Sequence, residues 1–120
     1  TGALSLLILD IGWCGGLTEA RRCAALANAY LTPVAAHDCT GPVVLTASVH
    51  FCQATVNAYV QEIVRAFYYG WYADIVTVLP PLENGFITPP TGHGLGLELQ
   101  PDFRNRKSTL SRISRLGNPH

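Results

Sequence analysis

The chain has 120 residues, of which 48% are hydrophobic and only 13% are charged, and its eight basic and eight acidic side chains leave no net charge. Ordinary globular domains carry about 25% charged residues, so this chain has little polar surface for its apolar content. It lacks the basic surface that nucleic acids and anionic membranes attract. Its apolar runs are shorter than the ~20 residues of a membrane helix. We expect a soluble, cytoplasmic protein that binds neither nucleic acid nor membrane.

The sequence has no methionine and begins at Thr1, just before an apolar run. Together with the low charge, this predicts a fragment of a larger protein that lacks its true N-terminus. The cysteines are widely and irregularly spaced and include no Cys-x-x-Cys pair. We therefore expect free thiols, and neither a zinc site nor a disulfide framework. These cysteines are Cys14, Cys23, Cys39 and Cys52.

The first 62 residues alternate predicted strands with predicted helices. Residues 4–9 form a continuous apolar run, which is typical of a parallel strand buried on both faces. Residues 34–36 and 59–61 are shorter candidate strands. Strands that alternate with helices of this length predict an α/β fold with a parallel sheet.

Two helices are predicted between these strands. Thr18 is the expected N-cap of the first, which ends at Pro33, and its apolar positions recur at spacings of three and four, on one helix face. Pro42 suits the first turn of the second helix, which runs to about Ala54. The second helix is apolar nearly all round, so it must be buried on more than one side. The positions expected on the buried face of the first helix are Leu17, Ala20, Ala24, Ala27 and Leu31.

Residues 63–120 have a different character. Aromatic side chains cluster at 67–72, where packing or a subunit contact is a better interpretation than base stacking. Asn84-Gly85 predicts a hairpin turn, and the glycine-rich residues 92–99 lead to another short strand. The end of the chain is basic, which favours a solvated surface over an anion site. Its basic residues are Arg104, Arg106, Lys107, Arg112 and Arg115.

Polar residues follow each of the three predicted strands directly. Asp10, His37 and Glu62 are separated by 27 and 25 residues, each about one compact βα unit. Because the carboxyl ends of parallel strands share one edge of a sheet, the three side chains should lie together there. An Asp beside a His fixes the imidazole tautomer and raises its basicity, leaving the other ring nitrogen to move a proton. Glu62 could hold a substrate oxygen, as a hydrogen-bond donor if burial keeps it protonated.

Simpler interpretations exist for each candidate. A single Asp or His at a strand end is often a turn former, and the threefold coincidence is what favours function. Cys39 could be a thiol nucleophile, but no separate His is available to activate it. The turn at residues 12–16 could cradle a phosphate, but it lacks the G-x-G-x-x-G spacing. His50 is expected to be a core or interface histidine.

These residues resemble the mandelate racemase-like members of the enolase superfamily, particularly acid-sugar dehydratases of the galactonate dehydratase type. Residues 10–19, Asp-Ile-Gly-Trp-Cys-Gly-Gly-Leu-Thr-Glu, are similar to that family's sixth barrel strand and loop. Residues 34–37, Val-Ala-Ala-His, resemble the seventh strand with its catalytic His, and residues 60–62, Val-Gln-Glu, resemble the eighth. Residues 94–98, Gly-Leu-Gly-Leu-Glu, are similar to the segment that returns to the capping domain.

The resemblance implies an α/β fold, namely the last three βα units of a (β/α)8 TIM-type barrel in residues 1–79. Residues 80–120 would be a C-terminal extension that packs on the capping domain. It also implies Mg²⁺ held by acidic residues on earlier strands, so that none of its ligands lies in this chain, and a sugar-acid substrate. His37, Asp10 and Glu62 would be the catalytic residues.

The function implied by the resemblance is magnesium-dependent dehydration of an acid sugar in the complete protein, a lyase reaction. A base removes the proton α to a carboxylate, and His37 with Asp10 acts as general acid/base. A racemase or epimerase is the alternative, and two further alternatives are a self-standing α/β binding module and a non-catalytic fragment. The apolar second helix suggests a homo-oligomer when the protein is complete.

Overall fold

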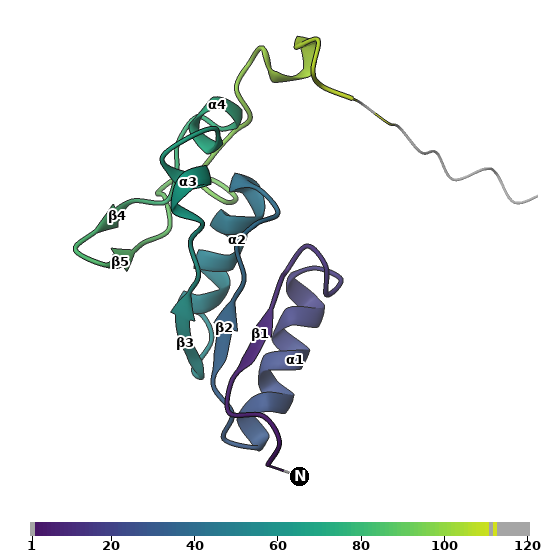
Figure 1. Ribbon diagram of the computed structural model, residues 1–120, viewed down its shortest axis with the longest axis vertical. Coiled ribbons are helices and arrows are strands. Elements are labelled where there is room, and N and C mark those ends of the chain that lie inside the picture. Colours follow the sequence, from purple (N-terminus) through teal and green to yellow (C-terminus); the bar gives the residue numbers. More distant parts are fainter. Residues whose placement is uncertain (1, 111, 113–120) are drawn as a thin grey trace, which may run out of the picture.

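The computed structural model describes residues 2–110 and 112, and its N-terminal half is a three-stranded sheet with two helices (Figure 1). The sheet order is β1-β2-β3 and both pairings are parallel. Leu9 of β1 stands opposite Ala36 of β2, which stands opposite Gln61 of β3. The predicted α/β arrangement is confirmed for these residues. The elements are β1 (Leu7–Leu9), α1 (Leu17–Ala29), β2 (Val34–Ala36), α2 (Pro42–Gln53) and β3 (Ala58–Gln61).

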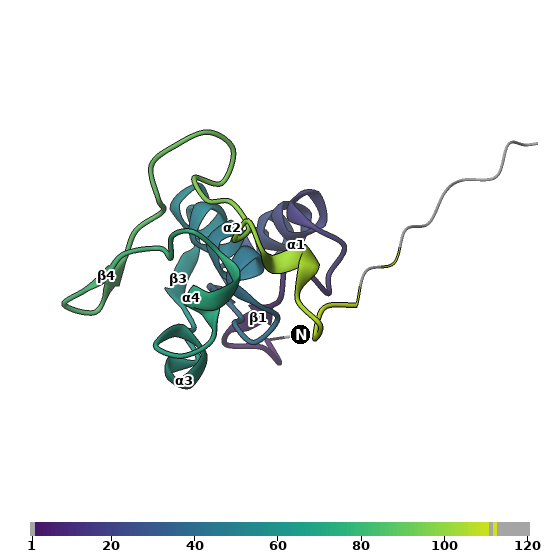
Figure 2. The same ribbon diagram turned by 90° about the horizontal axis from the view of Figure 1, so that it is seen from above.

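Both helices cover the same face of the sheet, where they lie side by side (Figure 2). The alanines of α1 recur at helical spacing and are buried, and their small side chains let α1 pack closely on the strands. Phe51 of α2 completes this apolar cluster. The cluster consists of Leu9, Ile11, Ala20, Ala24, Ala27, Val34, Ala36 and Phe51.

The prediction that residues 4–9 form a strand buried on both faces is wrong for the described residues. The strand begins only at Leu7, Leu4 is 66% exposed and Ile8 is 61% exposed. Val60 of β3 is also exposed. The reason is that β1 is an edge strand and the face opposite the helices has no layer packed on it within the described part of the chain.

The predicted cap of α1 is also wrong. Gly16 occupies the N-cap position with a φ of 95°, and its carbonyl accepts the amide of Ala20 at 3.0 Å. This left-handed conformation favours glycine, and Thr18 therefore lies inside the first turn. Leu17 and Leu31 are predicted on the buried face but are exposed. Leu31 is exposed because the helix ends at Ala29, and Leu17 is the first residue of the helix.

Helix α2 is buried on more than one side, as predicted. It begins at Pro42, and Leu45 and Val49 form a second apolar cluster with Tyr72, while Phe51 belongs to the first cluster. The aromatic residues that follow the sheet pack on this second cluster. Trp71 and Tyr72 meet edge to face with ring centroids 4.7 Å apart. The packing interpretation of the aromatic residues is thus confirmed.

The remaining elements are short: α3 (Arg65–Tyr68), α4 (Tyr72–Ile75), β4 (Leu82–Glu83), β5 (Phe86–Ile87) and a 3-10 turn at Phe103–Asn105. The predicted hairpin forms at Asn84-Gly85, where both residues have positive φ, as its turn requires. It projects away from the sheet (Figure 1).

The glycine-rich segment does not form the strand expected after it. Leu99 makes one isolated antiparallel bridge with Val76, and His50 Nε2 lies 3.1 Å from the carbonyl oxygen of Leu95. His50 therefore fastens this segment to α2. In the basic end, Arg106 donates two hydrogen bonds to Asp102, and Arg115 lies outside the described residues.

The described residues are more extended than a compact domain. Their radius of gyration is 16.4 Å, against about 13 Å for a compact domain of 100 residues. Among these residues, no helix is long and apolar enough to cross a membrane.

The glycine-rich segment generates a stability prediction. Gly96 has a φ of 76°, and a Cβ there would lie 2.7 Å from the carbonyl oxygen of Pro90. We expect Gly96→Ala to lower the free energy of unfolding by about 1–3 kcal/mol, measured by urea unfolding of the protein that carries this chain. Gly94→Ala is the matched control, because Gly94 has a similar φ of 61° but nothing within 4 Å of its Cβ position. Equal losses in the two variants would refute the close-approach explanation.

Candidate functional site

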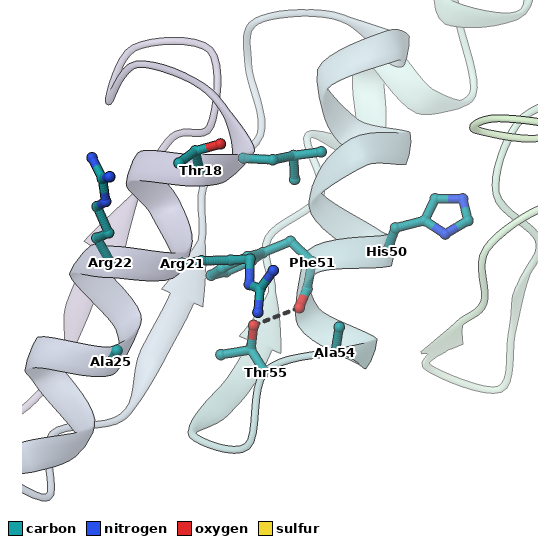
Figure 3. A pocket seen from close by; sticks show the side chains of 9 residues that line it. Thr18, Arg21, Arg22, Ala25, His50, Phe51, Ala54 and Thr55 are labelled. Atoms are coloured by element: carbon teal, nitrogen blue, oxygen red, sulfur yellow. Dashed lines mark hydrogen bonds between the residues drawn. The ribbon is translucent and has the colours of Figure 1, made fainter.

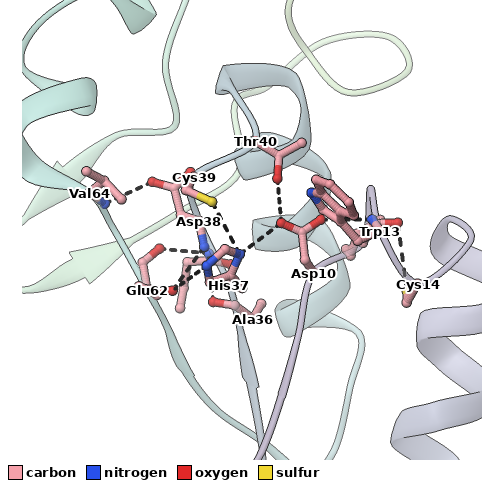
Figure 4. A network of polar contacts seen from close by, with 12 residues as sticks. Asp10, Trp13, Cys14, Ala36, His37, Asp38, Cys39, Thr40, Glu62 and Val64 are labelled. Atoms are coloured by element: carbon pink, nitrogen blue, oxygen red, sulfur yellow. Dashed lines mark hydrogen bonds and ion pairs between the residues drawn. The ribbon is translucent and has the colours of Figure 1, made fainter.

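The ends of the three parallel strands bring Asp10, His37 and Glu62 to one edge of the sheet (Figure 4). Each residue directly follows its strand. The amide of His37 donates to the carbonyl of Leu9 at 2.9 Å, and the amide of Glu62 donates to the carbonyl of Ala36 at 2.9 Å. The backbone ladder therefore continues one residue past the strands and sets the spacing of the polar side chains.

Asp10 and His37 are in direct contact. His37 Nδ1 lies 2.9 Å from Asp10 Oδ2, and the Asp10 side chain is only 8% exposed. An ionised carboxylate only accepts hydrogen bonds, so Nδ1 carries the proton and donates it. Nε2 is then the nitrogen that can exchange a proton. The hydrogen bond to Asp10 raises the pKa of His37, and the charge of Glu62 adds to this, while partial burial opposes it.

Two further groups hold the Asp10 carboxylate. The hydroxyl of Thr40 donates to Oδ2 at 2.5 Å, and the amide of Trp13 donates to Oδ1 at 3.0 Å. Partial burial works to raise the pKa of Asp10, but the hydrogen bonds from Thr40, His37 and Trp13 outweigh it and lower that pKa. Asp10 is therefore an anion at neutral pH. Sequence reasoning missed Thr40, whose only signal was its place in the loop that follows His37.

Glu62 lies on the other side of the imidazole. Its Oε2 is 3.8 Å from His37 Nε2 and accepts the amide of Asp38 at 3.2 Å. The side chain is 48% exposed, so the burial on which a hydrogen-bond-donor role depended is not present. Glu62 is placed to attract a protonated Nε2.

Asp38 is a buried acidic residue that the sequence analysis did not single out. It is 1% exposed, and its carboxylate accepts the hydroxyl of Tyr72 at 2.7 Å and the amide of Val64 at 2.9 Å. Burial and the contact with Asp38 raise the pKa of Tyr72. These bonds tie the loop after β2 to the segment after β3, and so hold His37 and Glu62 at a fixed separation.

Cys39 lies closer to His37 than the sequence suggested. Its Sγ is 3.8 Å from His37 Nδ1, and the residue is exposed. The ring beside it is that of His37 itself, whose Nδ1 already contacts Asp10, so this contact supplies no separate histidine to activate the thiol. All four cysteines are free, as predicted.

The described residues do not fit a magnesium ion. Mg²⁺ requires octahedral oxygen ligands, whereas a ring nitrogen of His37 and the thiol of Cys39 stand beside the Asp10 carboxylate and Asp38 is buried against Tyr72 and Val64. Within the described part of the chain, the one group of three potential ligands at this edge is Asp10, His37 and Cys39, which includes a thiol and an imidazole.

A hollow lies on the outer side of the helices, between α1 and α2 (Figure 3). Thr18, Arg21, His50 and Phe51 are among its lining residues, and it contains none of the strand-end residues. Arg22 also lines it and pairs with Glu19. The candidate residues for proton transfer therefore lie at the strand edge, outside this hollow.

The comparisons with known proteins agree with this arrangement. Residues 1–103 match the family model described as enolase C-terminal domain-like. An enolase of the mandelate racemase subgroup from Agrobacterium tumefaciens is 55% identical, with a TM-score of 0.78 over 87% of this chain and 27% of that one. An enolase protein from the environmental genome shotgun sequencing of the Sargasso Sea is 42% identical, with a TM-score of 0.84 over 98% of this chain and 31% of that one.

A curated relative, D-galactonate dehydratase from Ralstonia pickettii, is 32% identical over 87% of this chain and 31% of its own length. The chain thus spans about a third of the length of the relatives it matches. The predicted resemblance to the mandelate racemase-like enolase superfamily is confirmed, and these relatives imply an α/β fold of the TIM-barrel type. This chain belongs to the enolase C-terminal domain-like family.

Proposed function

We propose that this chain supplies the Asp10–His37 proton-transfer pair of an acid-sugar dehydratase, with D-galactonate as the first substrate to test. The observation that carries the proposal is the 2.9 Å contact between His37 Nδ1 and Asp10, at the strand edge next to Glu62. The similarity to D-galactonate dehydratase supports the substrate class.

The raised pKa of His37 suits a general acid. In the proposed reaction, a base from residues outside this chain removes the proton α to the substrate carboxylate. Protonated Nε2 of His37 gives its proton to the hydroxyl on the neighbouring carbon, which leaves as water. Asp10 keeps the ring oriented and stabilises the imidazolium before the transfer. Glu62 contacts the substrate near Nε2.

The proposal includes a barrel and a division of the chain. Residues 1–79 would be the last three βα units of an eight-stranded barrel, and residues 80–120 would be the extension that packs on a capping domain. The exposed apolar face at Ile8 and Val60 supports a further layer over the sheet. Magnesium dependence belongs to the proposal for the complete protein, with ligands on other residues, as does assembly into a homo-oligomer.

A racemase or epimerase remains the second candidate, favoured by the similar enolase of the mandelate racemase subgroup. There His37 would exchange a proton with the α-carbon itself. Product analysis separates the two reactions, because dehydration yields a keto-deoxy acid whereas epimerisation in deuterated water yields a stereoisomer labelled at the α-carbon.

The catalytic role of His37 is tested by His37→Asn in the protein that carries this chain. We expect dehydration to fall by about 10²-fold or more, since general acid–base groups contribute at least that much. His93→Asn, in the exposed glycine-rich loop, is the matched control and should keep normal turnover. Activity of His37→Asn within tenfold of the parent would exclude the proposed role.

Asp10→Asn tests the electrostatic part of the pair. Removing the carboxylate removes the main cause of the raised pKa of His37, so the protonated form should be lost at lower pH. We expect the alkaline limb of the dehydration pH–rate profile to move toward lower pH. Glu19→Gln, on the exposed start of α1, should leave the profile in place. An unmoved limb in Asp10→Asn would contradict the assignment.

The same pair makes stability depend on pH. His37 has a raised pKa, so its contribution is present below its usual value of 6.5 and is lost as pH rises through the raised value. Asp10 has a lowered pKa, so its contribution is present above 3.8 and is lost as pH falls further. We expect His37→Asn to lower the urea midpoint more at pH 5.5 than at pH 9. A loss that is independent of pH would indicate packing alone.

A further inference from the structure

Three potential metal ligands converge beside the proton-transfer pair. A carboxylate oxygen of Asp10, a ring nitrogen of His37 and the sulfur of Cys39 all lie within 4.8 Å of one another. Cys39 Sγ is 3.8 Å from His37 Nδ1, which is 2.9 Å from Asp10 Oδ2. The three side chains follow the neighbouring strands β1 and β2 and point toward one another (Figure 4). The arrangement uses a sulfur, a nitrogen and an oxygen.

The separations of Nδ1 from Sγ and from Oδ2 are close to those around a tetrahedral zinc ion, and the sulfur and the carboxylate oxygen lie within 4.8 Å of each other. Zinc bonds of about 2.0–2.3 Å place neighbouring ligand atoms roughly 3.4–3.6 Å apart. The sulfur would need to approach Nδ1 by a few tenths of an ångström, and the contact between Nδ1 and Oδ2 would need to open by about half an ångström. Cys39 is exposed and the His37 side chain is 34% exposed. A hydrated ion can therefore reach the site from solvent.

The donor set selects the class of metal. Thiolate and imidazole favour zinc and similar borderline or soft cations, whereas magnesium requires oxygen ligands. Three protein ligands leave the fourth zinc position to water. The Asp10 carboxylate also accepts hydrogen bonds from the hydroxyl of Thr40 and the amide of Trp13, one to each oxygen. Such bonds to a ligating carboxylate orient it and strengthen metal binding.

We propose that Asp10, His37 and Cys39 form a site for a zinc-like divalent cation, distinct from the magnesium of the proposed enzyme. The metal displaces the thiol proton of Cys39, which is released to solvent, and takes the place of the proton between Nδ1 and Asp10. The neutral imidazole then carries its proton on Nε2. With Nδ1 bound to the metal, the proton on Nε2 belongs to a neutral imidazole, which is a far weaker acid than the imidazolium and does not supply the proton that the leaving hydroxyl needs. Zinc therefore inhibits the enzyme, a consequence that rests on the proposed function.

The site is tested by metal binding to the protein that carries this chain, in the parent and in Cys39→Ser. Zinc affinity is measured by competition with a chromogenic chelator, and cobalt is used as a spectroscopic probe. We expect a thiolate-to-cobalt charge-transfer band in the parent that is absent in Cys39→Ser. Zinc affinity should fall by about tenfold or more in the variant. Cys23→Ser, on α1 away from the edge, is the matched control and should bind like the parent.

Cys39→Ala serves as a second variant, and urea unfolding shows whether either variant has lost its fold. Zinc affinity and cobalt spectra unchanged in a folded Cys39 variant would overturn the site. Inhibition of dehydration by zinc should weaken in Cys39→Ser by the same factor as binding, and inhibition unchanged there would also overturn it. Sulfur-dependent binding without inhibition would support the metal site and overturn the proton-transfer role of His37. Metal binding thus tests the cation site, and inhibition by the metal tests the proton-transfer role of His37.

Discussion

The parallel pairing of β1, β2 and β3 is the constraint on which the site depends. Each strand ends one residue before a polar side chain, and the amides of His37 and Glu62 extend the ladder across those ends. Parallel strands place equivalent ends at one edge. A shift of one residue in the β1–β2 register would turn the side chains of one strand to the other face and separate Asp10 from His37. The register of the sheet therefore sets the contact between Asp10 and His37.

The edge is further held by contacts from outside the sheet. Asp38, in the loop after β2, is buried and accepts a hydrogen bond from Tyr72. Tyr72 in turn packs on Leu45 and Val49 of α2. Through this hydrogen bond, the aromatic segment holds Asp38, the residue next to His37. On the other side, Thr40 holds Asp10 from the loop that precedes α2. The position of His37 depends on both apolar clusters, although the residue itself is one-third exposed.

The sequence predicted those features that local chemistry decides. Strand β2 begins and ends as predicted, α2 begins at Pro42, and the hairpin turns at Asn84-Gly85. The sequence-based prediction failed at the start of α1, where Gly16, which has no side chain, occupies the N-cap position expected for Thr18. It failed too where burial depends on a layer that the described residues do not contain, as at Ile8. Thr40 and Asp38 could not be assigned because their partners are 30 and 34 residues away in the chain.

The low charge of the chain has a consequence for its chemistry. Few carboxylates reach the strand edge, and Asp10 and Asp38 already use both oxygens to accept hydrogen bonds within the chain. Hydrogen bonds to both oxygens orient the Asp10 carboxylate, which suits it to hold the imidazole of His37. In the proposed enzyme, the magnesium ligands are residues outside this chain. Cys39 adds a soft ligand to the remaining Asp–His pair, so a cation that binds here competes with the proton of His37 and not with magnesium.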